Sequence, residues 1–297
     1  MAVLGGVVAA FTGFGGFLFI MCVLIGRLIE FICPLHKNQP PKEVLLGAAY
    51  AVFTCAISPP VGTLNGVVLV YLMGRLGSGW LDLGLLPFPV ALLLYLLAED
   101  FLEYWTHRAY HAFPFMWALH SLHHSDKSFN NFTGWRHAWL DRVINNILIY
   151  APLAIVFRAP PPILLAFTAI HMASGILMHL NSPIEFGRFS LWFMNPQFHR
   201  IHHSVQPEHW DKNFANALPL WDVVFRTSWK PRKGEFPDTG LTPSDKPIDL
   251  VDALIWPLHR PLGRLIASRG NNAPSVSCDT DCLEIDNTSG LGDVLTR

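Results

Sequence analysis

Residues 107–124 read HRAYHAFPFMWALHSLHH, and residues 199–203 read HRIHH. The first stretch opens with two histidines at positions i and i+4, which lie one turn apart on the same face of a helix. It closes with the pattern H-x-x-H-H, and the second stretch repeats that pattern. Eleven of the 14 histidines fall in residues 107–203. The eight histidines in these patterns are His107, His111, His120, His123, His124, His199, His202 and His203.

So dense a group of imidazole rings indicates a metal site. Protonated rings would repel one another, whereas a metal ion accepts their nitrogen lone pairs and keeps the rings neutral. Eight rings exceed the four ligands of a structural zinc site, so we expect at least two metal ions. Imidazole binds zinc, copper, iron and nickel alike, so the ring type leaves the metal open. We interpret His36, His209 and His259 as ordinary surface or core histidines.

The composition is that of a membrane protein. Hydrophobic residues make up 51% of the 297-residue chain and charged residues 14%, where soluble proteins carry about 25% charged residues. The mean hydropathy is +0.33. A net charge of −1 supplies no field that would attract a nucleic acid, so this class of partner is set aside. The five cysteines show no C-x-x-C spacing and predict neither a disulfide scaffold nor a cysteine metal site.

Five apolar segments predict helices that cross a hydrocarbon core of about 30 Å. One of these segments contains Ser58-Pro59-Pro60, so it forms either one kinked span, which we favour, or two half-helices. The predicted spans are 3–26, 44–73, 83–106, 143–157 and 161–180.

The order of these spans brings the histidines to one side of the membrane. If the third span exits at His107, the fourth and fifth spans cross and return through a tight turn at residues 158–162. Arg27, Lys37 and Lys42 lie in the loop between the first two spans, on the same side by parity, and predict that this side faces the cytoplasm.

We therefore expect an all-α fold, a polytopic transmembrane helical bundle with a cytosolic helical cap that carries a histidine-rich dimetal site. One membrane-embedded domain covers residues 1–267, with the cap at 107–142 and 181–267. Residues 268–297 are rich in Ser, Asn and Asp and predict a disordered tail.

The clusters, in this order and on this scaffold, resemble the fatty acid hydroxylase and sterol desaturase superfamily of integral-membrane di-iron oxygenases. The resemblance extends from about Asp100 to Thr227. Ala215 and Arg226 depart from it, because glycine is expected at both positions. The motifs that carry the resemblance are Asp100 with Tyr104-Trp-Thr-His107-Arg108, Trp117-Ala-Leu-His120, Arg136-His137, His179-Leu-Asn181, Pro196-Gln-Phe-His199, Asp211-Lys-Asn213, Trp221-Asp222 and Phe225-Arg226-Thr227.

The resemblance implies a centre of two iron ions that uses O2 and two electrons to hydroxylate or desaturate a lipid from the bilayer. It also implies a separate electron donor, ferredoxin-like or cytochrome b5-like, because the sequence contains no flavin, nicotinamide, iron–sulfur or haem signature. The implied metal ligands are His107, His111, His120, His123, His124, His179, His199, His202 and His203.

Other polar residues are candidates for contacts that orient the ligand rings. Glu103 and Asp100 precede His107 by four and seven residues and share its helical face, where a carboxylate could accept a ring N–H. Arg136 and His137 could orient a ligand or contact lipid headgroups, and Asn181 follows His179 closely. His171 lies deeper in the fifth span, and its role stays open.

Three functional hypotheses compete. The first is an O2-dependent lipid hydroxylase, with hydroxylation favoured over desaturation. The alternative is a zinc-dependent membrane hydrolase that acts on lipids through a metal-bound water. A metal transporter is disfavoured, because only His171 lies well inside a predicted span. The sequence leaves the substrate open among sterols, fatty acyl chains, alkylglycerols and carotenoids, and it does not give the oligomeric state.

Overall fold

The computed structural model describes residues 2–77, 79–241, 247 and 249–270. This part of the chain is mostly helical, as expected, and it includes one pair of two-residue strands that the all-α prediction did not contain. The elements in chain order are α1 (Ala2–Ile32), α2 (Pro41–Leu76), β1 (Leu81–Asp82), η1 (Leu83–Leu85), α3 (Phe88–Ala112), α4 (Pro114–His124), η2 (Thr133–Trp135), α5 (Trp139–Asn145), η3 (Asn146–Tyr150), α6 (Ala151–Val156), β2 (Phe157–Arg158), α7 (Pro161–Met178), η4 (Gly187–Phe189), α8 (Pro196–His202), η5 (Pro207–His209), α9 (Leu220–Val224) and α10 (Leu250–Gly270).

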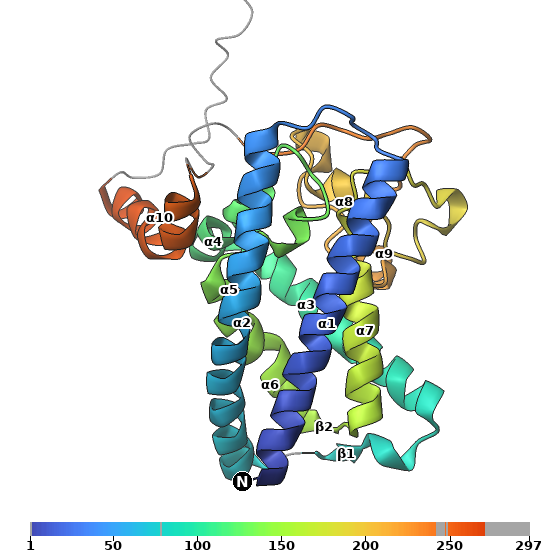
Figure 1. Ribbon diagram of the computed structural model, residues 1–297, viewed down its shortest axis with the longest axis vertical. Coiled ribbons are helices and arrows are strands. Elements are labelled where there is room, and N and C mark those ends of the chain that lie inside the picture. Colours follow the sequence, from blue (N-terminus) through green and yellow to red (C-terminus); the bar gives the residue numbers. More distant parts are fainter. Residues whose placement is uncertain (1, 78, 242–246, 248, 271–297) are drawn as a thin grey trace, which may run out of the picture.

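The long helices form a bundle with different structures at its two ends. Figure 1 shows α1, α2 and α7 running along the long axis of the molecule, with α4 and α8 near one end and β1 and β2 at the other. The turn that joins α6 to α7 therefore lies at the end opposite to the histidine clusters, as the order of the spans predicts. α10 packs against α4 at the side of the bundle.

Two helical segments within the described residues are long and apolar enough to cross a membrane. They are Trp139–Val156, which runs through α5, η3 and α6, and Pro161–Met178 in α7. They correspond to the predicted spans 143–157 and 161–180, although Phe157 belongs to β2 and α7 ends before His179. The predicted spans 3–26 and 44–73 lie within α1 and α2, and their membrane crossing stays a prediction.

The backbone of α2 is helical throughout Pro41–Leu76, including Ser58-Pro59-Pro60.

The predicted span 83–106 is wrong at its beginning, because residues 83–87 are outside the helix. Leu83–Leu85 form the short turn η1, in which Asp82 accepts a hydrogen bond from the Gly84 N–H at 2.9 Å, and α3 begins only after Pro87. Proline is favoured in the first turn of a helix, where its missing N–H has no intrahelical partner.

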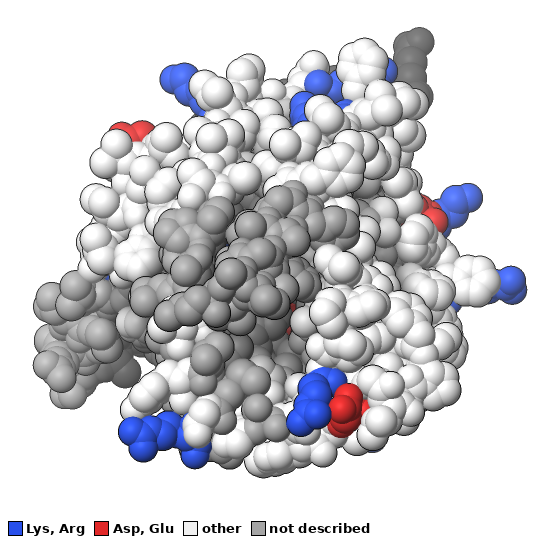
Figure 2. Space-filling model, turned by 60° about the horizontal axis from the view of Figure 1, so that its bottom comes forward, with Lys and Arg blue, Asp and Glu red and all other residues white. Residues whose placement is uncertain are grey.

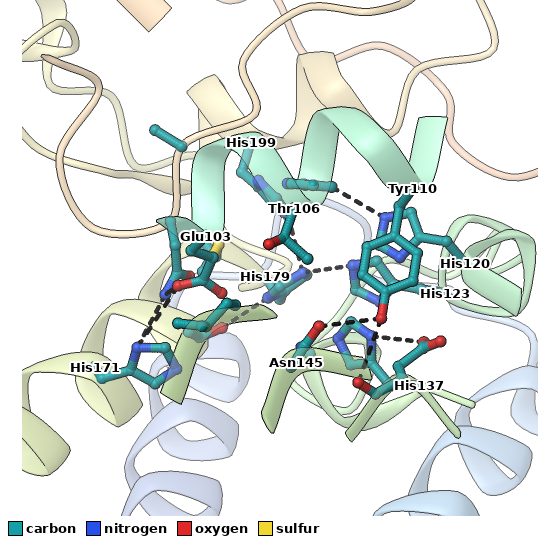
Figure 3. A pocket seen from close by; sticks show the side chains of 18 residues that line it. Glu103, Thr106, Tyr110, His120, His123, His137, Asn145, His171, His179 and His199 are labelled. Atoms are coloured by element: carbon teal, nitrogen blue, oxygen red, sulfur yellow. Dashed lines mark hydrogen bonds and ion pairs between the residues drawn. The ribbon is translucent and has the colours of Figure 1, made fainter. Parts of the chain in front are cut away.

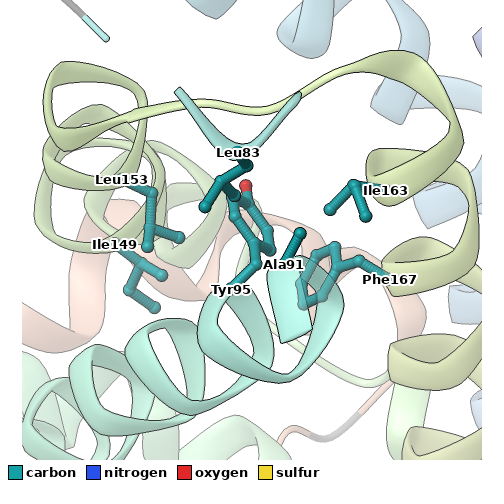
Figure 4. Close-up of a cluster of buried hydrophobic side chains, with 7 residues drawn as sticks. All are labelled: Leu83, Ala91, Tyr95, Ile149, Leu153, Ile163 and Phe167. Carbon is teal, nitrogen blue, oxygen red and sulfur yellow. The ribbon is translucent and has the colours of Figure 1, made fainter. Parts of the chain in front are cut away.

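Apolar side chains hold the bundle together beneath the histidines. Figure 4 shows a buried cluster between η1, α3, η3, α6 and α7, in which Tyr95 meets Phe167 edge-on with ring centroids 5.1 Å apart. Large apolar side chains are also exposed on the outside of α1, α2 and α3, among them Phe31, Leu45 and Leu93. Among the described residues visible in Figure 2, charged side chains are sparse on the face toward the β1–β2 end. These surfaces suit a lipid environment.

Of the predicted tail 268–297, residues 271–297 lie outside the described residues, so its disorder stays a prediction.

Candidate metal centre

A sharp turn between α3 and α4 brings the first five histidines together. α3 ends at Ala112, and Pro114 begins α4 after a single linking residue. The chain therefore folds back, and rings from the end of α3 meet rings from α4. The ring centroids of His107 and His120 are 4.8 Å apart, and those of His111 and His124 are 4.9 Å apart.

α8 supplies the second H-x-x-H-H triplet. Its N-terminus is fixed by Asn195, whose side-chain oxygen accepts the Phe198 N–H at 3.0 Å, and Pro196 occupies the first turn. The helix packs near the end of α7, where Met178 and Phe198 share a buried cluster. His179, the first residue after α7, thereby lies against His199 with ring centroids 4.5 Å apart.

The nine predicted ligands converge in two groups, and within each group the candidate nitrogen atoms lie within 4.8 Å of one another. Each H-x-x-H-H triplet contributes to both groups: its first and last rings join one group, and its middle ring joins the other. The first group is His107, His111, His120, His124 and His202, and the second is His123, His179, His199 and His203.

Backbone carbonyls fix the orientation of four of these rings. The Nδ1–H of His179 donates to Gly175 O at 2.7 Å, and that of His123 donates to Thr133 O at 3.1 Å. A carbonyl oxygen can only accept, so the proton is on Nδ1, and Nε2 presents a lone pair to the interior. The same arrangement joins His107 to Phe214 O at 2.7 Å and His202 to Lys212 O at 2.8 Å.

These lone pairs face one another. The Nε2 atoms of His123 and His179 are 3.3 Å apart, although both rings have their proton on Nδ1. Among the described residues, the buried Nε2 atoms of His111, His124 and His202 have no hydrogen-bond partner. Buried nitrogen atoms without partners are unfavourable, and a cation bound between them would remove the cost. The residues present therefore fit two metal ions with imidazole ligands.

Burial keeps the rings in the neutral form that binds metal. It lowers the pKa of His107 to about 3 and that of His179 to about 3, although each ring donates to a carbonyl, which raises the value. In His120, His123, His124, His199, His202 and His203, burial is also the largest cause and lowers the pKa well below 6.5.

The segment after α8 encloses the first group, and Asp222 holds it in place. The Asp222 carboxylate accepts the N–H groups of Phe214 at 2.9 Å and Ala215 at 2.8 Å, as well as the Thr227 hydroxyl at 2.7 Å. Phe214 then offers its carbonyl to His107. The contacts of Asp222 with this segment and with Thr227 therefore give the Trp221-Asp222 and Arg226-Thr227 motifs a structural role.

The backbone of this segment is bent at several residues with positive φ. Asp211 has φ 57°, and its carboxylate oxygen lies 3.4 Å from His111 Nδ1. Asn213 has φ 58°, and its side chain bonds to the backbone of Phe198 and Trp229. Arg226, at φ 60°, is one of the two positions where the family resemblance leads us to expect glycine, which reaches this conformation without strain.

His137 lies against a ligand ring but belongs to neither main group. Its ring stacks on His123 with centroids 4.1 Å apart. Its Nδ1 is 3.8 Å from Asp141, a buried carboxylate whose two oxygens accept no hydrogen bond from the described residues. His120, His137 and Asp141 form a third close group of possible ligands. The sequence reasoning missed Asp141, although its i+4 spacing from His137 offered a signal.

Arg136 and Asn181 contact other parts of the fold instead of the ligand rings. The Arg136 guanidinium is buried between Glu43 at 3.4 Å and Asp126 at 3.7 Å. The Asn181 N–H donates to Glu30 of α1 at 2.8 Å. These two residues thus connect the site-bearing loops to α1 and α2, and the described contacts give them no direct role in orienting a ring.

A cavity of about 150 Å³ lies beside the rings. Figure 3 shows His120, His137 and Tyr110 on one side of it, Glu103 and His171 on the opposite side, and His179 between them. Asp100 is directed elsewhere, since its carboxylate accepts the Ala217 N–H at 2.9 Å.

The sequence comparisons agree with this geometry. Residues 92–227 match the family model for fatty acid hydroxylase. This segment, somewhat less than half of the chain, is similar to fatty acid hydroxylase domains. The domain contains all nine converging histidines, the cavity and the Asp222 contacts, so the family resemblance noted in the sequence is confirmed.

Relatives of the domain include enzymes that act on lipids. The alkylglycerol monooxygenase of Caenorhabditis elegans is 31% identical over 52% of this chain and 30% of its own length. The human alkylglycerol monooxygenase is 32% identical over 44% of the chain and 29% of its own length. The ornithine lipid hydroxylase OlsE of Rhizobium tropici is 30% identical over 52% of the chain and 47% of its own length. The alignments thus span less than half of each of these relatives. No solved structure matches the chain significantly.

Proposed function

We propose that the protein is a membrane-bound, O2-dependent lipid hydroxylase whose nine converging histidines hold two iron ions. The observation that supports this most strongly is the division of the rings into two groups with inward-facing nitrogen atoms. The matched family and the lipid hydroxylase and monooxygenase relatives support the reaction class. Iron is the proposed metal because O2 activation needs a change of oxidation state, which zinc does not undergo.

The proposed reaction converts a lipid C–H group, O2, two electrons and two protons into the lipid alcohol and water. The two iron ions would supply the O2-activating chemistry. The electrons come from a separate donor, ferredoxin-like or cytochrome b5-like, that docks at the histidine end. We place this end on the cytoplasmic side, and we expect no nucleic-acid partner.

The chain's own residues position the substrate. Ile149 and Met178 give the cavity apolar walls, and Ile149 also belongs to the buried apolar cluster between the helices. A lipid chain reaching the cavity past this cluster would present a C–H bond beside His120 and His179. Apolar contacts of this kind exclude water and hold the reacting carbon in one place, which favours a single oxidation position.

The test is incubation of the iron-loaded protein with labelled oxygen gas, a reducing partner and extracted membrane lipids, followed by mass spectrometry. Label in a lipid alcohol is the expected result. Loss of two hydrogens, with label only in water, would identify a desaturase instead. Lipid turnover that persists without O2 and releases a hydrolysis product would refute the oxygenase and favour the zinc hydrolase.

Elemental analysis provides an independent check on the metal. We expect about two iron ions per chain, one for each histidine group. Full activity with one or no bound metal ion would contradict the dinuclear centre.

A further inference from the structure

An acidic group occupies the side of the cavity that faces away from His120. Glu99 and Glu103 are four residues apart on α3 and therefore share a face, and His171 approaches them from α7. Glu99 Oε1 lies 3.4 Å and Glu103 Oε2 3.9 Å from His171 Nδ1, and the Asn216 amide donates to Glu103 at 2.9 Å. Glu103, His171 and Asn216 line the cavity, and Figure 3 shows Glu103 and His171 together at its edge.

This group contains more acceptors than donors. Glu99 is only 1% exposed, and its Oε1 atom accepts no hydrogen bond from the described residues. Within the described chain, His171 is the sole basic side chain that pairs with either glutamate. With both glutamates ionised, even a protonated His171 would leave a formal charge of −1 on the three side chains, and Asp100 is equally buried. A buried excess of negative charge needs a cation or a proton as partner.

We propose that Glu99, Glu103 and His171 form a subsite that binds a primary ammonium group of the lipid substrate. This inference rests on the proposed lipid hydroxylase function and specifies its substrate class as an aminolipid. The ammonium would point an N–H group at Glu103, which lines the cavity, while the buried Glu99 beside His171 would add negative charge, and the neighbouring carbons would extend across the cavity toward His179.

An ammonium fits this subsite better than a hydroxyl group does. A hydroxyl donates one hydrogen bond and brings no charge, whereas an ammonium donates three and can take the place of a proton as the positive partner of the carboxylates. Hydrogen bonds between ionised partners are about twice as strong as neutral ones. The cavity of about 150 Å³ has room for a small headgroup at this position.

The experiment compares two probes with the same alkyl chain, dodecylamine and 1-dodecanol, binding to the metal-loaded protein in a neutral detergent at pH 7. Binding is followed by thermal stabilisation and by tryptophan fluorescence. We expect dodecylamine to bind at least about tenfold more tightly than dodecanol, as one charge-assisted contact allows. In Glu103→Gln, which keeps the size of the side chain, the preference should disappear, so that dodecylamine and dodecanol bind about equally tightly.

The matched control is Asp82→Asn, which removes a carboxylate at the β1–β2 end and should leave the tenfold preference intact. Metal content and the unfolding temperature establish that each variant is folded. Equal binding of the two probes to the unaltered protein, or an unchanged preference in Glu103→Gln, would overturn the subsite. Because binding is measured without O2 or reductant, a failed subsite leaves lipid hydroxylation intact, and absence of hydroxylation leaves the binding result intact.

Discussion

Replacing His179 with alanine should remove one metal ion and leave the other. His179 is one of four rings in the second group, and the first group has five rings of its own. Four ligands together give about 10–16 kcal/mol of apparent binding free energy in zinc-finger peptides, so one ring contributes about 3 kcal/mol. That loss weakens binding of the second ion by about two orders of magnitude.

The assay loads the protein anaerobically with ferrous iron, exposes it to a mild chelator and counts the retained iron by mass spectrometry. The unaltered protein should keep about two ions, and His179→Ala about one, since each histidine group could hold one ion. His111→Ala should cost less, because four rings remain in the first group. His209→Ala is the matched control, since this buried ring belongs to neither group and should leave both ions bound.

Two outcomes would refute the reasoning. If His179→Ala keeps both ions under chelation, the second group does not hold an ion of its own. If His179→Ala and His111→Ala each lose both ions together, the two histidine groups do not bind their ions independently.

Three further predictions follow from contacts and charges of the same domain. The metal-free protein should lose stability as the pH falls below about 6.5, because the unfolded chain then binds protons that His107 and His179, with pKa values of about 3, do not bind when folded. The free energy of unfolding should fall by up to about 1.4 kcal/mol per pH unit for each ring. A free energy of unfolding that stays constant between pH 6.5 and 4 would contradict this. Asp222→Asn should lower stability by about 1–3 kcal/mol in denaturant unfolding, since it weakens a buried acceptor of two backbone N–H groups, and an unchanged midpoint would count against that role. Single cysteines near Pro161 and Gln206 should be labelled from opposite sides of the membrane, and labelling from one side would disprove the span order.

The convergence of eight of the nine rings could be predicted because side-chain type and helical spacing carry the information, whereas His179 was expected only from the family resemblance. Histidines at i, i+3 and i+4 lie near a common face of a helix whatever surrounds them, and their number predicts more than one ion. The sequence could not say which ring joins which group, since His123 and His124 are neighbours in the chain and separate only in three dimensions.

The groups that orient the rings were harder to predict for a physical reason. Four of them are backbone carbonyls, such as those of Gly175 and Lys212, and every residue has a carbonyl. The carboxylate predictions were incomplete for a related reason: Asp100 and Glu103 share the face of His107, but the fold directs them to Ala217 and His171. Helix ends also depended on local turn chemistry, as at Pro87.

The alternation within the two histidine triplets has a mechanical consequence. α4 gives its outer rings to the first group and its middle ring to the second, and α8, together with His203 directly after it, does the reverse. In the proposed dinuclear centre, each helix would therefore contribute ligands to both ions. A tilt or slide of either helix would displace the two ions together, and their separation would depend on the fixed angle between successive side chains of a helix. The distance between the two proposed ions would thus be set by helix geometry more than by the loops around the site.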